Sequence, residues 1–105
     1  MLNEDFYNNV YDIVEAIPVG KVATYGGIAR ALGRPQNFRA VGFAMKKVPE
    51  HLDLPCHRVV NSKGELAPHY VFGDREEQKF RLLQEGVEFK DTYVINMKKC
   101  LWHEL

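Results

Sequence analysis

Residues 24–47 read TYGGIARALGRPQNFRAVGFAMKK, and the order of residue types in this stretch decides the fold. Thr24 can cap a short helix that runs to Leu32, because its hydroxyl can accept from the first backbone N–H groups. The turn residues 33–35 end that helix, and Asn37 can cap a second helix that continues to about the end of the stretch. Two short helices joined by a turn that contains glycine predict a helix-turn-helix.

The chain before this stretch predicts one amphipathic helix. Apolar residues recur there at helical spacing, and the breakers Pro18 and Gly20 follow them: Phe6, Val10, Ile13, Val14 and Ile17. This spacing places the apolar side chains on one face, as in a helix that covers a core. We therefore expect a helix over residues 4–17.

The chain after the stretch predicts a hairpin and a further helix. Residues 58–61 and a segment that begins near Glu65 can pair around a turn at residues 62–64, which would form a wing beside the helices. Asp74 and Glu77 have the spacing of a capping box. In the helix that they start, Phe80 and Leu83 predict a stripe of side chains that faces the core, and Gly86 suits the end of the helix. Residues 87–105 are expected to add one strand and an aromatic tail.

These elements and the length of 105 residues predict one α+β domain over residues 1–105. Its architecture is a winged helix-turn-helix-like helical domain with a small β hairpin. The only cysteines are Cys56 and Cys100, no apolar run approaches a membrane span, and the N-terminus lacks the features of a signal peptide. We therefore expect a cytoplasmic monomer with free thiols, no membrane contact and no cofactor.

The formal net charge of zero hides a basic middle segment. Residues 20–63 carry eight Lys or Arg residues against two acids, whereas residues 1–19 carry four acids and no Lys or Arg. A local positive face suits phosphate binding, because affinity depends on the charge near the phosphates rather than on the total. A solvated basic face without a partner is the alternative interpretation.

Residues 54–60 read LPCHRVV and set a thiol directly beside an imidazole. Pro55 restrains the backbone before Cys56, and the β-branched pair at the end of the motif predicts a short buried strand. Because an adjacent histidine can activate a cysteine, the motif indicates covalent chemistry; a buried, inert cysteine is the alternative. Neighbouring residues of a strand point to opposite faces, so Cys56 and His57 can act together only through a turn or a bridging water.

A zinc or redox site is a third class of function to weigh. Cys56, His57, Cys100 and His103 offer four ligand types. However, their pairs are C-H and C-x-x-H rather than the two spaced pairs of a usual structural site, and adjacent ligands chelate poorly. We therefore expect no metal.

The motifs IPVGKVATYGGIARALG, RAVGFAM and LPCHRVV, followed by Glu85 and Gly86, resemble those of the O6-alkylguanine-DNA alkyltransferases. Their order and spacing match the DNA-binding and active-site domain of that family over about residues 14–88. The resemblance implies a DNA repair protein that binds duplex DNA and flips O6-alkylguanine into a pocket. It also implies irreversible transfer of the alkyl group to Cys56 in a single turnover.

The resemblance assigns the catalytic roles. Cys56 would attack the alkyl group, His57 would take the thiol proton through a water, and Glu85 would orient the histidine and stabilise its charge. Independently of the resemblance, we expect Arg58 to be a structural arginine that forms a salt bridge. Its positive charge would also contribute to the electrostatic field at the thiol.

The resemblance also assigns DNA-binding residues. Tyr25 would press on the target phosphate, and Arg39 would fill the gap left by the flipped guanine, as a planar cation can. Small residues at Ala40 and Gly42 would permit close approach in the minor groove. Tyr25 or Arg39 alone would be interpreted as an ordinary surface or half-buried residue. The assignment depends on the spacing of both residues relative to Cys56, which matches the family.

The expected base pocket contains Val48, Pro49, Val59 and Tyr70, and it departs from the family pattern. Val48 stands where the family has an asparagine before proline, and valine cannot make that residue's hydrogen bonds. Residues 68–73 stand in place of the family's Gly-Gly lid, and we expect the family's preceding N-terminal domain to be missing.

These departures, the spacing RLLQEG and a tail with Lys98, Lys99 and Trp102 resemble the short alkyltransferase-like proteins. Those proteins bind and flip alkylated guanine without accepting the group, and pass the lesion to nucleotide excision repair proteins. They usually carry tryptophan or alanine where this chain has Cys56. Two functions therefore remain: a single-turnover alkyltransferase, and a non-enzymatic lesion sensor with nucleotide excision repair proteins as partners.

Overall fold

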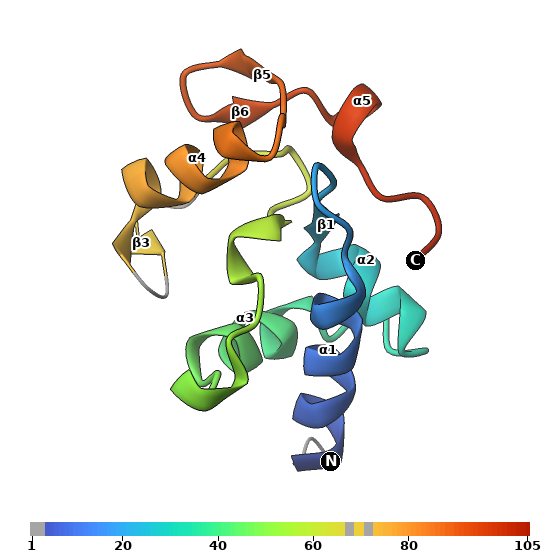
Figure 1. The fold of residues 1–105 in the computed structure, drawn as a ribbon. Helices are drawn as coiled ribbons and strands as arrows, with labels where there is room; N and C mark the ends of the chain where they lie inside the picture. The colour runs from blue at the N-terminus through green and yellow to red at the C-terminus, as the bar shows by residue number, and fades with distance from the viewer. Residues whose placement is uncertain (1–3, 67–68, 71–72) are drawn as a thin grey trace.

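Three helices form one half of the protein (Figure 1). The computed structural model describes residues 4–66, 69–70 and 73–105. Helices α1 (Glu4–Ala16), α2 (Tyr25–Ala31) and α3 (Phe38–Lys46) pack together, with α3 against both of the others. The helix predicted over residues 4–17 is thus confirmed, and its apolar stripe faces the core that the three helices share.

The helix-turn-helix is also confirmed. The Thr24 hydroxyl caps α2 by accepting from the Gly27 N–H at 2.9 Å, as the sequence predicts. Gly33 follows the helix with a φ of +72°, a conformation that glycine adopts without strain. Asn37 is the residue that precedes α3, as predicted, but its side chain makes no capping hydrogen bond.

Two very short parallel strands lie at the centre of the molecule. Strand β1 (Ala23–Thr24) pairs with β2 (Val59–Val60), with Ala23 opposite Val59. On its other side the β1 segment meets the C-terminal tail, where Val22 bridges to Leu101. There the Val22 N–H donates to the Cys100 carbonyl at 2.9 Å, and the Trp102 N–H donates to the Val22 carbonyl at 2.8 Å.

These strands separate two hydrophobic cores. Successive strand residues point to opposite faces, so Ala23 and Val59 join the core of α1, α2 and α3. Val22 and Val60 face the other way and join a second core. The remaining buried members of that second core come from the later part of the chain: Leu66, Leu82, Val87, Ile95 and Cys100.

The hairpin predicted between residues 58–61 and Glu65 is wrong. The turn itself exists, because the Gly64 N–H donates to the Asn61 carbonyl at 3.0 Å. Its two arms have other partners, however, since β2 pairs with β1 and Glu65 bridges to Val94. Both residues of β2 are buried and pair with the equally buried β1, whereas the segment at Glu65 alternates between buried and exposed residues.

The described antiparallel pairs lie elsewhere and complete an α+β fold. Strand β3 (His69–Tyr70) pairs with β4 (Gly73–Asp74), and β5 (Phe89–Asp91) pairs with β6 (Val94–Ile95). A short helix, α5 (Met97–Cys100), follows β6, so the C-terminal region contains two strands and a helix rather than the one strand expected. No helix within the described ranges is long and apolar enough to span a membrane.

Helix α4 (Arg75–Gln84) begins as predicted but faces the core with other residues. Asp74 caps it by accepting from the Glu77 N–H at 3.0 Å. The inward stripe predicted at Phe80 and Leu83 is wrong, because these side chains are 56% and 51% exposed. Leu82 is buried in their place, together with a polar residue in the preceding turn.

Candidate active site

A single turn of 3-10 helix, η2 (Cys56–Arg58), holds the predicted thiol and imidazole. The Arg58 N–H donates to the Pro55 carbonyl at 3.0 Å and closes this turn. The chain therefore turns at Pro55, which is the condition that the sequence set for Cys56 and His57 to act together. Both side chains are buried, with exposures of 3% and 8%.

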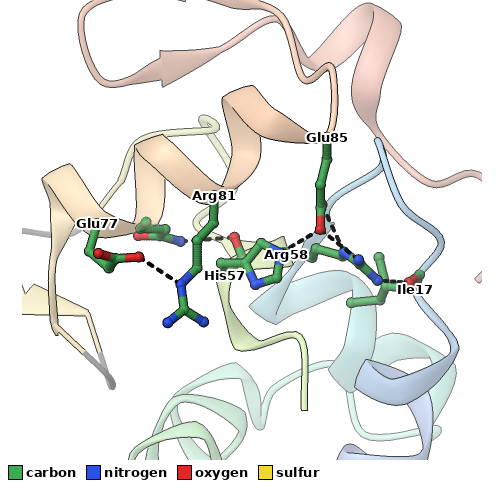
Figure 2. A network of polar contacts seen from close by, with 7 residues as sticks. Ile17, His57, Arg58, Glu77, Arg81 and Glu85 are labelled. Atoms are coloured by element: carbon green, nitrogen blue, oxygen red, sulfur yellow. Dashed lines mark hydrogen bonds and ion pairs between the residues drawn. The ribbon is translucent and has the colours of Figure 1, made fainter. Parts of the chain in front are cut away.

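Glu85, directly after α4, and Arg58 together join η2 to α4 and to the end of α1 (Figure 2). Glu85 Oε2 lies 2.8 Å from His57 Nε2. Arg58 donates to both carboxylate oxygens, from Nε at 2.9 Å and from Nη2 at 2.6 Å. Arg58 Nη1 also donates to the carbonyl of Ile17, just after α1, at 2.7 Å. The predicted salt-bridge role of Arg58 is thus confirmed, and the predicted residues His57 and Glu85 are in direct contact.

Burial and the neighbouring charges together set the protonation of His57, and burial is the larger influence on its pKa. Burial favours a higher pKa for Glu85, but hydrogen bonds from Arg58 and His57 outweigh burial and bring this pKa to about 2. Burial lowers the pKa of His57, although Glu85 partly opposes the effect. A neutral imidazole next to an ionised carboxylate donates its Nε2–H to Glu85 and keeps a lone pair on Nδ1. That buried Nδ1 has no hydrogen-bond partner among the described residues.

Cys56 is a protonated thiol in this environment. Burial raises its pKa to about 11, although its own backbone N–H and the charge of Arg81 act in the opposite direction. The thiol therefore needs a base before it can attack, and the Nδ1 lone pair of His57 is a base in the same turn. The arrangement suits a nucleophile that is activated only when a substrate and a bridging water complete the site.

Gln78 supports this turn and was not predicted from the sequence. Its Nε2 donates to the His57 carbonyl at 3.1 Å and contacts the Val59 carbonyl at 3.4 Å, so α4 holds both ends of the segment after Cys56. Gln78 is only 4% exposed. The available signal was its position four residues before Leu82, which places both on one helical face.

The predicted DNA-binding residues lie on the helix-turn-helix. Tyr25 begins α2, is half-buried and packs on the main core. Arg39 is exposed in the first turn of α3, and a Cβ added at Gly42 would meet nothing within 4 Å, so this helix surface is open. Ala40 is different: it is 7% exposed and belongs to the main core, so its side chain faces the protein interior rather than the open surface.

The predicted pocket residues divide into three cases. Val48 and Val59 are buried in the same core as Cys56. Pro49 is exposed and precedes a short 3-10 helix, η1 (Glu50–Leu52). Tyr70 is also predicted to line the pocket, but its side chain lies outside the described part of the structure.

The four candidate zinc ligands are divided between the two halves of the molecule. Cys56 lies in the main core and Cys100 in the second core. Within residues 4–66, 69–70 and 73–105, no group of three His, Cys, Asp or Glu side chains is placed to hold a metal ion.

Helices α2 and α3 form a helix-turn-helix beside the buried Cys56 and the His57–Glu85 pair, which is the arrangement of a DNA-binding domain. The family described as 6-O-methylguanine DNA methyltransferase, DNA binding domain, matches residues 5–87. The chain belongs to this family.

Individual relatives carry different names within the family. Alkyltransferase-like protein 1 of Schizosaccharomyces pombe is 42% identical and covers 97% of this chain and 98% of its own. The DNA base-flipping protein of Escherichia coli (strain K12) is 38% identical over 95% of this chain and 76% of its own. A methylated-DNA–protein-cysteine methyltransferase of Methanosarcina acetivorans is 40% identical, but the match covers only 51% of that protein.

Solved structures agree with the described fold. S. pombe Atl1 in complex with damaged DNA containing O6-carboxymethylguanine matches with a TM-score of 0.86 over 97% of this chain and 98% of that one, at 42% identity. The O6-methylguanine-DNA methyltransferase of Pyrococcus kodakaraensis matches with a TM-score of 0.65 over 78% of this chain and 46% of that one, at 43% identity.

Proposed function

We propose that this protein binds duplex DNA, flips O6-alkylguanine into a pocket at Cys56 and accepts the alkyl group on that cysteine. The observation that carries the proposal is the state of His57. Its Nε2 is bound to an ionised Glu85, and its buried Nδ1 has no described partner, one residue after the thiol. A carboxylate that fixes the tautomer of a histidine beside a nucleophile is the arrangement expected for nucleophilic catalysis.

The transfer step follows from these positions. His57 Nδ1 takes the thiol proton through a water, and Cys56 Sγ attacks the alkyl carbon. The new S–C bond forms as the C–O6 bond breaks, and guanine leaves with the electron pair of that bond and takes a proton. Because the thioether is stable, the protein performs one turnover.

The DNA-binding half of the proposal rests on the helix-turn-helix. Arg39 and the open surface at Gly42 lie on α3, and Tyr25 starts α2 directly after Thr24. Thr24 is in register with Val60, so the helix that carries Tyr25 is tied to the strand after Cys56. The relative whose DNA complex contains O6-carboxymethylguanine supports the choice of lesion.

A lesion sensor without transfer is the second candidate. Two observations favour it: Val48 replaces the asparagine of the family pattern, and the similarity to alkyltransferase-like protein 1 extends over almost the whole of both chains. In that case the same pocket would hold the base, and Cys56 would remain unmodified.

The intact mass of the protein distinguishes the two candidates. Wild type, Cys56→Ala and Cys100→Ser would each be incubated with a duplex that contains one O6-methylguanine, and binding would be measured in parallel. We expect one added methyl group on wild type and Cys100→Ser, and none on Cys56→Ala. Lesion-selective binding by all three with no added mass would establish the sensor instead.

A further inference from the structure

The exposed face of α3 combines aromatic and basic side chains. Its buried face consists of Ala40, Val41, Ala44 and Met45. At 3.6 residues per turn, the remaining positions cover about half of the helix circumference. They form the α3 outer face, defined by Phe38, Arg39, Gly42, Phe43, Lys46 and Lys47.

An aromatic ring lies within this basic face. Phe43 is 56% exposed, and it is one turn after Arg39, about 40° away around the helix. Lys46 Nζ lies 5.8 Å from the centre of the Phe43 ring. A large apolar side chain that stays in water between cations indicates a surface that another molecule covers.

The charges around Phe43 identify the kind of molecule. Arg39, Lys46 and Lys47 are all exposed on the same face and have no carboxylate partner in the described structure. Three cations in two turns of helix complement phosphates, and the open surface at Gly42 allows a close approach. Duplex DNA therefore complements this face in charge.

We infer that Phe43 is an apolar wedge that contacts the DNA beside the nucleotide that Arg39 replaces. The inference rests on the proposed function and assigns a further residue to DNA distortion. Proteins that widen or kink the minor groove use such wedges against sugars and base steps, where an aromatic ring stabilises an unstacked base. Lys46 and Lys47 hold the adjacent phosphates, and Phe43 supplies a contact that salt does not screen.

The test measures binding of the full chain to labelled duplexes with and without one O6-methylguanine, at several salt concentrations. The variants are Phe43→Ala, Phe43→Leu and Lys46→Ala. Phe80→Ala is the matched control, because Phe80 is also 56% exposed but lies on α4. Circular dichroism would check that each variant is folded, which is expected because Phe43 contributes little to the core.

We expect Phe43→Ala to raise the Kd for the lesion duplex about tenfold without changing its salt dependence. Phe43→Leu should keep most of the affinity, and Phe80→Ala should bind like wild type. Lys46→Ala should instead reduce the slope of log Kd against log salt by about one. An unchanged Kd for Phe43→Ala, or a loss that follows the salt pattern of Lys46→Ala, would overturn the wedge. Failure of wild type to bind the lesion duplex would overturn the proposed function as well.

Discussion

At the scale of single residues, the site depends on one carboxylate with three donors. Glu85 accepts from His57 and twice from Arg58, and Arg58 reaches on to the carbonyl of Ile17. Hydrogen bonds to charged groups contribute more than neutral ones, and this carboxylate is largely shielded from water. Glu85 therefore serves the stability of the fold and the tautomer of His57 together.

The substitution Glu85→Gln tests how Glu85 stabilises the fold, through the pH dependence of the free energy of unfolding. The pKa of Glu85 is about 2 in the folded protein, below the ordinary value of 4.5. Its contribution to stability is therefore complete above about pH 4.5 and is lost as the pH falls toward 2. We expect the free energy of unfolding, measured in urea, to fall more steeply over this range in wild type than in Glu85→Gln.

Glu104→Gln, which changes an exposed carboxylate in the C-terminal tail, is the matched control and should keep the wild-type slope. Equal slopes for wild type and Glu85→Gln would mean that the network leaves the pKa of Glu85 at its ordinary value.

Gly42→Ala separates the needs of the fold from those of binding. Glycine inside a helix costs roughly 1 kcal/mol relative to alanine, and the new Cβ meets nothing within 4 Å. We therefore expect the variant to be more stable in urea by up to about 1 kcal/mol. The same methyl group occupies the surface that the DNA would approach, so affinity for duplex DNA should fall. A variant that is more stable and binds equally well would exclude close approach at this position.

At the scale of elements, α4 supports η2, the turn that holds Cys56 and His57. Gln78 and Glu85 lie at opposite ends of this helix, and both hold η2, the first through a backbone carbonyl and the second through a side chain. Arg81 lies between them, and its Nε is bound to Glu77 at 2.8 Å (Figure 2). Movement of α4 would therefore change the position of the imidazole and the charge near the thiol together.

Gln78→Met removes the backbone contact and keeps the size of the side chain. The His57 carbonyl would lose its described donor, and a buried polar group without a partner costs about 1–3 kcal/mol. We expect urea unfolding to show a loss of this size and any alkyl transfer to slow. Gln84→Met, an exposed position on the same helix, is the control. A stability equal to that of the control would show that α4 holds η2 by other contacts.

The success of sequence-based prediction also varies by element. Thr24 caps α2 through a neighbour three residues away, and such local geometry is readable from sequence. The partner of Val59 and Val60 is not local, because β1 lies much earlier in the chain. The turn residues at 62–64 therefore suggested the wrong pairing, with the segment at Glu65. Gln78 was missed because a buried amide is expected only once its carbonyl partners are known.

At the scale of the whole molecule, the C-terminal tail connects the two cores. Cys100 lies in the second core, and Trp102 packs against the main core, while both contact Val22 through backbone hydrogen bonds. The tail therefore acts as a third parallel strand beside β1. Helices α1 to α3 and the later elements are held to one another along this line and along β2.

Removal of residues 102–105 tests the contribution of the tail. The Val22 carbonyl loses its donor and the main core loses the packing of Trp102, so we expect a loss of at least about 2 kcal/mol in the free energy of unfolding. Circular dichroism in urea is the measurement, because Trp102 is the only tryptophan. Removal of residues 104–105 alone is the control. A shortened chain as stable as the control would show that β1 and β2 join the cores without the tail.

The parallel pairing of Ala23 with Val59 also has a consequence for the order of folding. The contacts of α2 with α3 are local, whereas this pairing closes a long loop, and closing long loops slows folding. We expect the helix-turn-helix to form early and η2, which directly precedes β2, to be positioned late. A nascent chain would then present its helix-turn-helix before the turn that holds Cys56 is in place.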